Sequence, residues 1–168
     1  IGHLFSIKDF PYFEESMISL LELSSSSELK NSKAAFKSLK KLVKYADLEN
    51  RQKLLDLLLQ LFENCTSYDE YHFEKLITLL TELICRLKGK IDEKFDIIWE
   101  LLTSGVSKFP FLFVLPISQM SSSCKTKFLP YLETTLNLIN DILNSEHFEL
   151  GCASLKILIQ KSYLTEFA

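Results

Sequence analysis

Apolar residues recur at helical spacing along nearly the whole chain, in segments separated by short polar breaks. The breaks come about every 20 residues, a length typical of one helix with its connecting turn. Residues three and four positions apart lie on one side of an α-helix, so each segment is predicted to bury one face. The plainest segment has its apolar residues at Ala35, Phe36, Leu39, Leu42, Val43 and Ala46.

The composition favours helices over strands. The chain of 168 residues has only four glycines and four prolines, fewer turn residues than a β-rich fold of this size normally needs. It is 47% hydrophobic and 24% charged, which is ordinary for a globular protein. We therefore predict an all-α fold of seven or eight antiparallel helices. Residues 1–168 are predicted to form a single helical-repeat domain, either complete or as a fragment of a longer chain.

Polar residues and glycines indicate where these helices begin and end. Asp9 is predicted to cap the first helix and Asp92 the fifth, because a short carboxylate can accept hydrogen bonds from the free amides of a first turn. Either Asp47 or Asn50 is predicted to cap the third helix. Gly89 is predicted to follow the fourth helix, where a left-handed residue often ends the helical chain.

Prolines interrupt the periodicity in the second half of the chain. Residues 106–123 are predicted to form a short buried helix bent at Pro116, with a short strand as the weaker alternative. Residues 125–143 are predicted to form one helix. The last helix has small residues at Gly151, Cys152 and Ala153, where a neighbour could approach closely. The predicted core includes Leu55, Leu58, Leu59, Phe62, Leu80, Leu83 and Trp99.

A stripe of lysines runs opposite the apolar side of the second helix. Residues 28–53 contain eight Lys or Arg and three Asp or Glu, a net charge of +5, whereas the remainder of the chain carries −8. We name this stripe the lysine face; it lies within an arc of about 100°. It could bind phosphates or an acidic protein segment, or be only a solvated surface. The absence of arginine and of a clearly interleaved exposed aromatic disfavours base stacking. The lysine face comprises Lys30, Lys33, Lys37, Lys40, Lys41 and Lys44, of which the last five are the candidate partner-binding residues.

No motif for catalysis, a cofactor or a metal is visible. The cysteines are far apart, and none has a histidine at zinc-ligand spacing. They are predicted to be buried, reduced thiols of an intracellular protein. Paired acids stand at predicted helix starts, where they favour the helix dipole. No apolar run is long enough to span a membrane. The cysteines are Cys65, Cys85, Cys124 and Cys152, and the histidines are His3, His72 and His147.

The helix lengths, the hairpin spacing and stretches such as Glu149–Leu158 resemble the HEAT/armadillo α-solenoids. HEAT units often carry an Asp and then an Arg near the turn within a repeat, and Asp47 and Arg51 are similar to that pair. Residues 106–123 interrupt the regular spacing of the predicted helices, so a non-repetitive helical bundle is the alternative. The resemblance implies a non-enzymatic protein-binding scaffold, which we expect in a nuclear or cytoplasmic assembly. The alternative function is nucleic-acid binding through residues 30–44.

Overall fold

A computed structural model describes residues 12–64 and 70–161 of the chain. All regular elements in these two ranges are helical and none is a strand, which confirms the all-α prediction for this part of the protein. The chain divides into two compact units, Ile1–Leu83 and Ile84–Ala168, with the division inside the fourth helix. The predicted extent of a single repeat domain over residues 1–168 stays a prediction.

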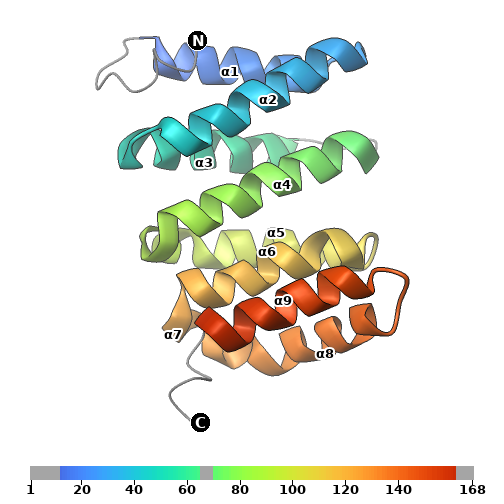
Figure 1. Cartoon of the computed structure of the whole chain (residues 1–168). Coiled ribbons are helices and arrows are strands. Elements are labelled where there is room, and N and C mark those ends of the chain that lie inside the picture. Colours follow the sequence, from blue (N-terminus) through green and yellow to red (C-terminus); the bar gives the residue numbers. More distant parts are fainter. Residues whose placement is uncertain (1–11, 65–69, 162–168) are drawn as a thin grey trace. The chain divides into compact units, whose positions relative to one another are not determined.

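Unit 1 is built from long helices that run back and forth (Figure 1). Helix α1 packs against both α2 and α3. The buried side chains Met17, Leu39 and Leu58, one from each of these helices, have no exposed surface, so each stabilises the fold by about 1.5–3 kcal/mol relative to solvent exposure. The helices are α1 (Phe13–Ser24), α2 (Leu29–Tyr45), α3 (Leu48–Asn64) and α4 (Glu70–Leu87), of which α4 continues into unit 2.

Two buried serines join α1 to α2. The Ser32 hydroxyl donates a hydrogen bond of 2.8 Å to the Ser24 carbonyl, and the Ser24 hydroxyl donates one of 2.6 Å to the Leu21 carbonyl. Carbonyls in the last turn of a helix lack partners within the helix, and buried polar groups are costly when unpaired. The hydrogen bond from Ser32 therefore pairs a carbonyl at the end of α1 and fixes α2 against it.

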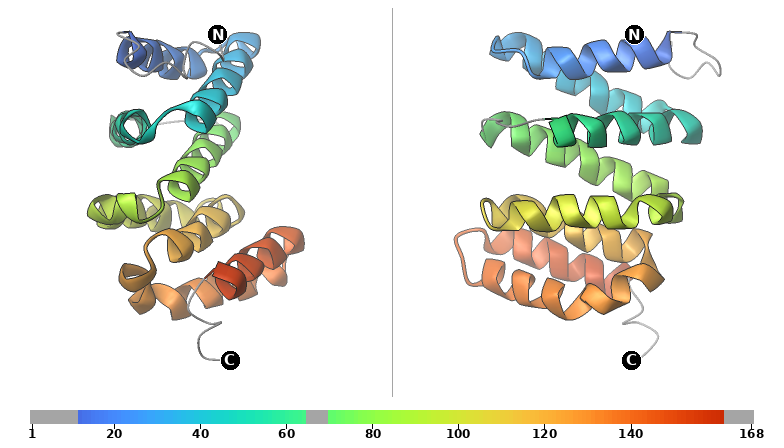
Figure 2. Two further views of the ribbon diagram at one scale, coloured as in Figure 1. Left: turned by 60° about the vertical axis from the view of Figure 1, so that its left-hand side comes forward. Right: turned by 180° about the vertical axis from the view of Figure 1, so that it is seen from behind.

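Unit 2 is organised around α6, which packs against α5, α8 and α9 (Figure 2). Phe113, Val114 and Met120 of α6 have no exposed surface. The Ser123 hydroxyl at the end of this helix donates a hydrogen bond of 2.9 Å to the Ile84 carbonyl. The elements of this unit after α4 are the 3₁₀ helix η2 (Lys88–Lys94), α5 (Phe95–Val106), α6 (Pro110–Ser123), α7 (Lys125–Phe128), the 3₁₀ helix η3 (Leu129–Tyr131), α8 (Leu132–Leu143) and α9 (Phe148–Lys161).

The two proline-containing regions of the chain form different structures: one is a continuous α-helix and the other is interrupted. Residues 110–123 form an α-helix with Pro110 in its first turn and Pro116 buried inside it, so the helix prediction is confirmed and the strand alternative is wrong. The single helix predicted over 125–143 is wrong, because the chain passes through α7, η3 and α8. Pro130 lies in η3; it has no amide hydrogen, and its ring excludes the carbonyl four residues earlier.

Two predicted helix ends are also wrong. Lys88, with a φ of 49°, takes the left-handed conformation after α4, whereas Gly89 has no positive φ. Asp92 lies within η2, and Lys94 precedes α5 without a side-chain cap. The first predicted cap, Asp9, lies outside the described residues.

Six of the seven predicted core residues are buried, from Leu55 in α3 to Leu83 in α4. The seventh, Trp99, is only half-buried: its ring centroid lies 4.3 Å from that of Tyr131, which is itself half-buried and so leaves part of the indole accessible. Gly151 is buried as predicted, but Cys152 and Ala153 are exposed and take no part in the close approach.

Candidate interaction surface on helix α2

The structure places the lysine face on the exposed side of α2. The opposite side is buried, with Leu39, Leu42 and Val43 at zero exposure. All six lysines are exposed, as the helical spacing predicts: Lys30, Lys33, Lys37, Lys40, Lys41 and Lys44. The five candidate partner-binding residues therefore share one accessible side of one helix.

The turn after α2 holds the end of this helix in place. The Arg51 guanidinium donates from Nε to the Val43 carbonyl at 2.8 Å and from Nη2 to the Lys44 carbonyl at 3.1 Å. Asp47 Oδ1 accepts a hydrogen bond of 2.9 Å from the Asn50 amide, which confirms Asp47 as a cap of α3. The last carbonyls of a helix have no hydrogen-bond donor within the helix, and a charged side chain such as that of Arg51 supplies one.

The lysines of this face are close neighbours of one another. Like charges three or four positions apart on a helix destabilise it by about 0.2–0.5 kcal/mol per pair. The first turn of α2 has no acidic residue, and Lys30 stands near the positive end of the helix dipole. Six such pairs occur: Lys33–Lys37, Lys37–Lys41, Lys40–Lys44, Lys30–Lys33, Lys37–Lys40 and Lys41–Lys44.

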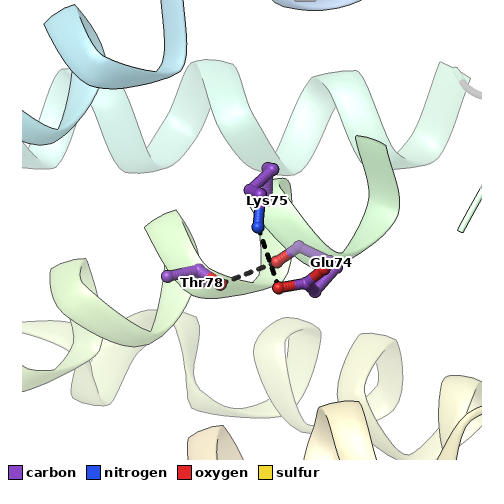
Figure 3. Close-up of polar contacts among 3 residues, drawn as sticks. All are labelled: Glu74, Lys75 and Thr78. Carbon is purple, nitrogen blue, oxygen red and sulfur yellow. Dashed lines mark hydrogen bonds and ion pairs between the residues drawn. The ribbon is translucent and has the colours of Figure 1, made fainter. Parts of the chain in front are cut away.

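Lysines on other helices of unit 1 have acidic partners. Lys75 Nζ lies 2.9 Å from Glu74 Oε1, and Thr78 donates to the carbonyl of the same glutamate (Figure 3). Lys53 pairs with Glu49 at 3.0 Å, and the hydrogen bond and charge of that carboxylate raise the pKa of Lys53. Within the described ranges, no comparable ion pair is found for the lysine face.

One aromatic residue adjoins the lysine face, contrary to the sequence-based expectation. Tyr45 is exposed, and Lys44 Nζ lies 5.2 Å from the centroid of its ring. Tyr45 follows Lys41 by four positions, so both residues are on the same side of α2. The four-residue spacing from Lys41 could have identified Tyr45 from the sequence. Tyr45 is the last residue of α2, however, and its side of the helix is less evident at that boundary.

The cysteines are in three different environments. Cys124 is buried, and burial, followed by a hydrogen bond to Asp92 and its negative charge, raises the pKa of this thiol to about 12. Cys85 is half-buried and Cys152 is exposed, so the prediction of burial is wrong for Cys152. Cys65 lies outside the described residues, as does His3.

The described residues form neither a metal-binding cluster nor a membrane-spanning helix. No group of three or more His, Cys, Asp or Glu side chains in them is arranged to hold a metal ion. None of the helices formed by these residues combines the length and apolar character that crossing a membrane requires.

Comparison with protein-family models, with curated proteins and with solved structures finds no match to this chain.

Proposed function

We propose that the chain is a non-enzymatic interaction scaffold, whose lysine face binds an acidic segment of another protein within an intracellular assembly, nuclear or cytoplasmic. The observation that carries the proposal is a row of six exposed lysines, without acidic partners among the described residues. The row destabilises α2 through its like-charge neighbours. If the face served only solubility, alternating charges would avoid this loss of helix stability, as the Glu49–Lys53 pair does on α3.

The dimensions of the lysine face fit a short segment. Fourteen positions separate Lys30 from Lys44, a length of about 21 Å at 1.5 Å per residue. An extended peptide covers that length with roughly six or seven residues. A partner with several Asp or Glu in one such stretch could contact the whole row.

The scaffold part of the proposal draws on the helical arrangement. Arg51 donates a hydrogen bond across the turn between α2 and α3 to the Val43 carbonyl, and Asp47 caps α3 at the same turn, as a HEAT/armadillo-like hairpin would require. We propose that the hairpins stack as in these α-solenoids, with a non-repetitive bundle as the alternative arrangement.

Nucleic-acid binding is the second candidate function, and Tyr45 favours it. An exposed ring beside lysines can stack on a base while the ammonium groups contact phosphates. The face has no arginine, the side chain best suited to bidentate phosphate contacts, so we rank this candidate second.

The test is a charge reversal of the middle of the lysine face, Lys37→Glu with Lys40→Glu and Lys41→Glu. The matched control reverses three exposed lysines elsewhere, Lys90, Lys108 and Lys156, so that both variants change the net charge equally. Circular dichroism checks folding. Fluorescence anisotropy then measures binding of a synthetic peptide of about 15 residues rich in Glu and Asp, of a single-stranded RNA and of a duplex DNA, each at low and at physiological salt.

We expect the acidic peptide to bind the wild-type chain and the control, and to lose at least tenfold in affinity for the triple variant. Exposed charge pairs contribute about 0.2–1 kcal/mol each, so three lysines contribute roughly 0.6–3 kcal/mol. Their reversal also adds repulsion of the acidic peptide, which brings the expected loss above about 1.4 kcal/mol, a factor of ten. Loss of RNA or DNA binding instead, with a steep salt dependence, would support the second candidate. If the folded triple variant binds every probe as the wild type does, the lysine face is only solvated surface.

A further inference from the structure

Helix α9 presents a row of apolar residues to solvent, on a different side from its packed face. The row consists of Phe148, Cys152, Leu155 and Ile159, spaced by four, three and four positions, so it follows one line along the helix. Phe148 is 55% exposed and Ile159 is 49% exposed. Cys152 is exposed as well, and Leu155 is half-buried. A solvent-facing helix normally carries polar residues along such a line.

The buried side of α9 lies against α8. A Cβ atom on the buried Gly151 would lie 2.9 Å from the Leu143 side chain, so the two helices touch there. They run antiparallel (Figures 1 and 2), which places Leu136, two turns before Leu143, toward the Ile159 end of the row. Leu136 is itself 37% exposed. We name this patch the α8–α9 surface; it consists of Leu136, Phe148, Cys152, Leu155 and Ile159.

The charges on these two helices and on the turn between them are mainly acidic. Residues 132–161 contain four carboxylates and two lysines, a net charge of −2, and the four carboxylates are exposed. Two copies of the chain meeting through this surface would bring their carboxylates together, which like-charge repulsion opposes. The charge pattern therefore favours a basic partner over a second copy. The charged residues are Glu133, Asp141, Glu146, Glu149, Lys156 and Lys161.

We propose that the α8–α9 surface docks an amphipathic helix of a partner protein, with Lys or Arg flanking its apolar row. The spacing of four, three and four positions is the one by which two helices pack along a narrow apolar seam. From Phe148 to Ile159 the row is about 16 Å long, or three helical turns. An amphipathic helix recognised through apolar anchors three and four positions apart matches that length and pattern. The partner differs from that of the lysine face, because the required charge is opposite.

The probes are two synthetic helical peptides of about 18 residues, identical in their leucine row and differing only in their flanks, Lys and Arg in one and Glu in the other. Fluorescence anisotropy measures the affinity of each peptide for the whole chain. The test variant combines Phe148→Ser with Ile159→Ser. The matched control combines Leu129→Ser with Ile97→Ser, at apolar residues of unit 2 that are 52% and 46% exposed and lie outside the surface. Circular dichroism verifies that both variants fold.

We expect the basic peptide to bind the wild type and the control, and to bind the test variant at least tenfold more weakly. Alkylation of Cys152, followed by mass spectrometry of the modified peptide, should slow at least fivefold when the basic peptide saturates the chain. The acidic peptide should give no protection of Cys152, even where it binds the lysine face. The proposal is overturned if the basic peptide does not bind the wild type, if the folded test variant binds it unchanged, or if Cys152 stays equally reactive. Self-association of the wild type that the test variant abolishes would assign the surface to a second copy and likewise overturn it.

Discussion

The substitution Gly105→Ala tests the packing of α5 against α6. An alanine inside a helix normally stabilises it by up to about 1 kcal/mol relative to glycine. At this position the new Cβ would overlap the Phe113 ring at Cζ, Cε1 and Cε2. The ring has no exposed surface, so it has little room to move. Overpacking of this kind costs about 1–3 kcal/mol, and overlap with three ring atoms points to the upper end. We therefore expect a net loss of about 2 kcal/mol in the free energy of unfolding.

The measurement is denaturant unfolding followed by tryptophan fluorescence. Trp99 is the single tryptophan of the chain and lies on α5, so its emission reports on the unit that contains the substitution. The control is Gly89→Ala, whose Cβ would meet only the Ser123 carbonyl oxygen at an ordinary 3.9 Å. That change should be neutral, or stabilising by about 0.4–1 kcal/mol.

A second substitution separates the steric clash from other causes. Leucine lacks the three ring atoms that a Cβ at position 105 would meet, so Phe113→Leu should relieve much of the cost. In a double-mutant cycle, we expect Gly105→Ala to cost at least 1 kcal/mol less in the Phe113→Leu background. If Gly105→Ala stabilises the wild-type chain, or if the two substitutions are additive, the argument from ring overlap is refuted.

Three further predictions concern single residues. Leu58→Ala, at a site with no exposed surface, should lower the free energy of unfolding by about 2–5 kcal/mol; an unchanged melting temperature would contradict its burial. Arg51→Ala removes two charged hydrogen bonds to the end of α2 and should cost about 1–3 kcal/mol in thermal or chemical unfolding, whereas Gln52→Ala, at an exposed neighbour, should be neutral. Cys124, with its pKa raised to about 12 by burial, should resist iodoacetamide at pH 8–9 while Cys152 reacts; equal rates would show that Cys124 is accessible.

Helix α2 and its lysine face follow from the sequence because every signal for them is local. Leu39, Leu42 and Val43 recur at helical spacing and are buried, and the lysines fall on the opposite side and are exposed. An amphipathic helix has one stable orientation against any apolar neighbour, so the period alone identifies the accessible side. The candidate site could therefore be predicted residue by residue, apart from Tyr45 at its end.

Features that depend on a particular neighbour could not be predicted in this way. Cys152 and Ile159 belong to an apolar pattern that suggests burial, yet both are exposed. The sequence period shows that two faces of α9 are apolar but does not show which of them a distant helix covers. On the covered face, α9 packs against α6 and α8, and Gly151 lies close to the Leu143 side chain.

The amino-acid sequence by itself determined the helical class, most helix positions and the exposed side of α2, because spacing and charge act within a few residues. Only the tertiary structure showed where some helices end and which of the two apolar faces of α9 is buried. Lys88 rather than Gly89 takes the left-handed turn, and the chain at Pro130 tightens into a 3₁₀ helix between α7 and α8. Trp99 stays half-exposed against Tyr131. The break at Pro130 has a local cause, its missing amide hydrogen and its ring, whereas the packing of α9 and of Trp99 depends on contacts between different segments of the chain.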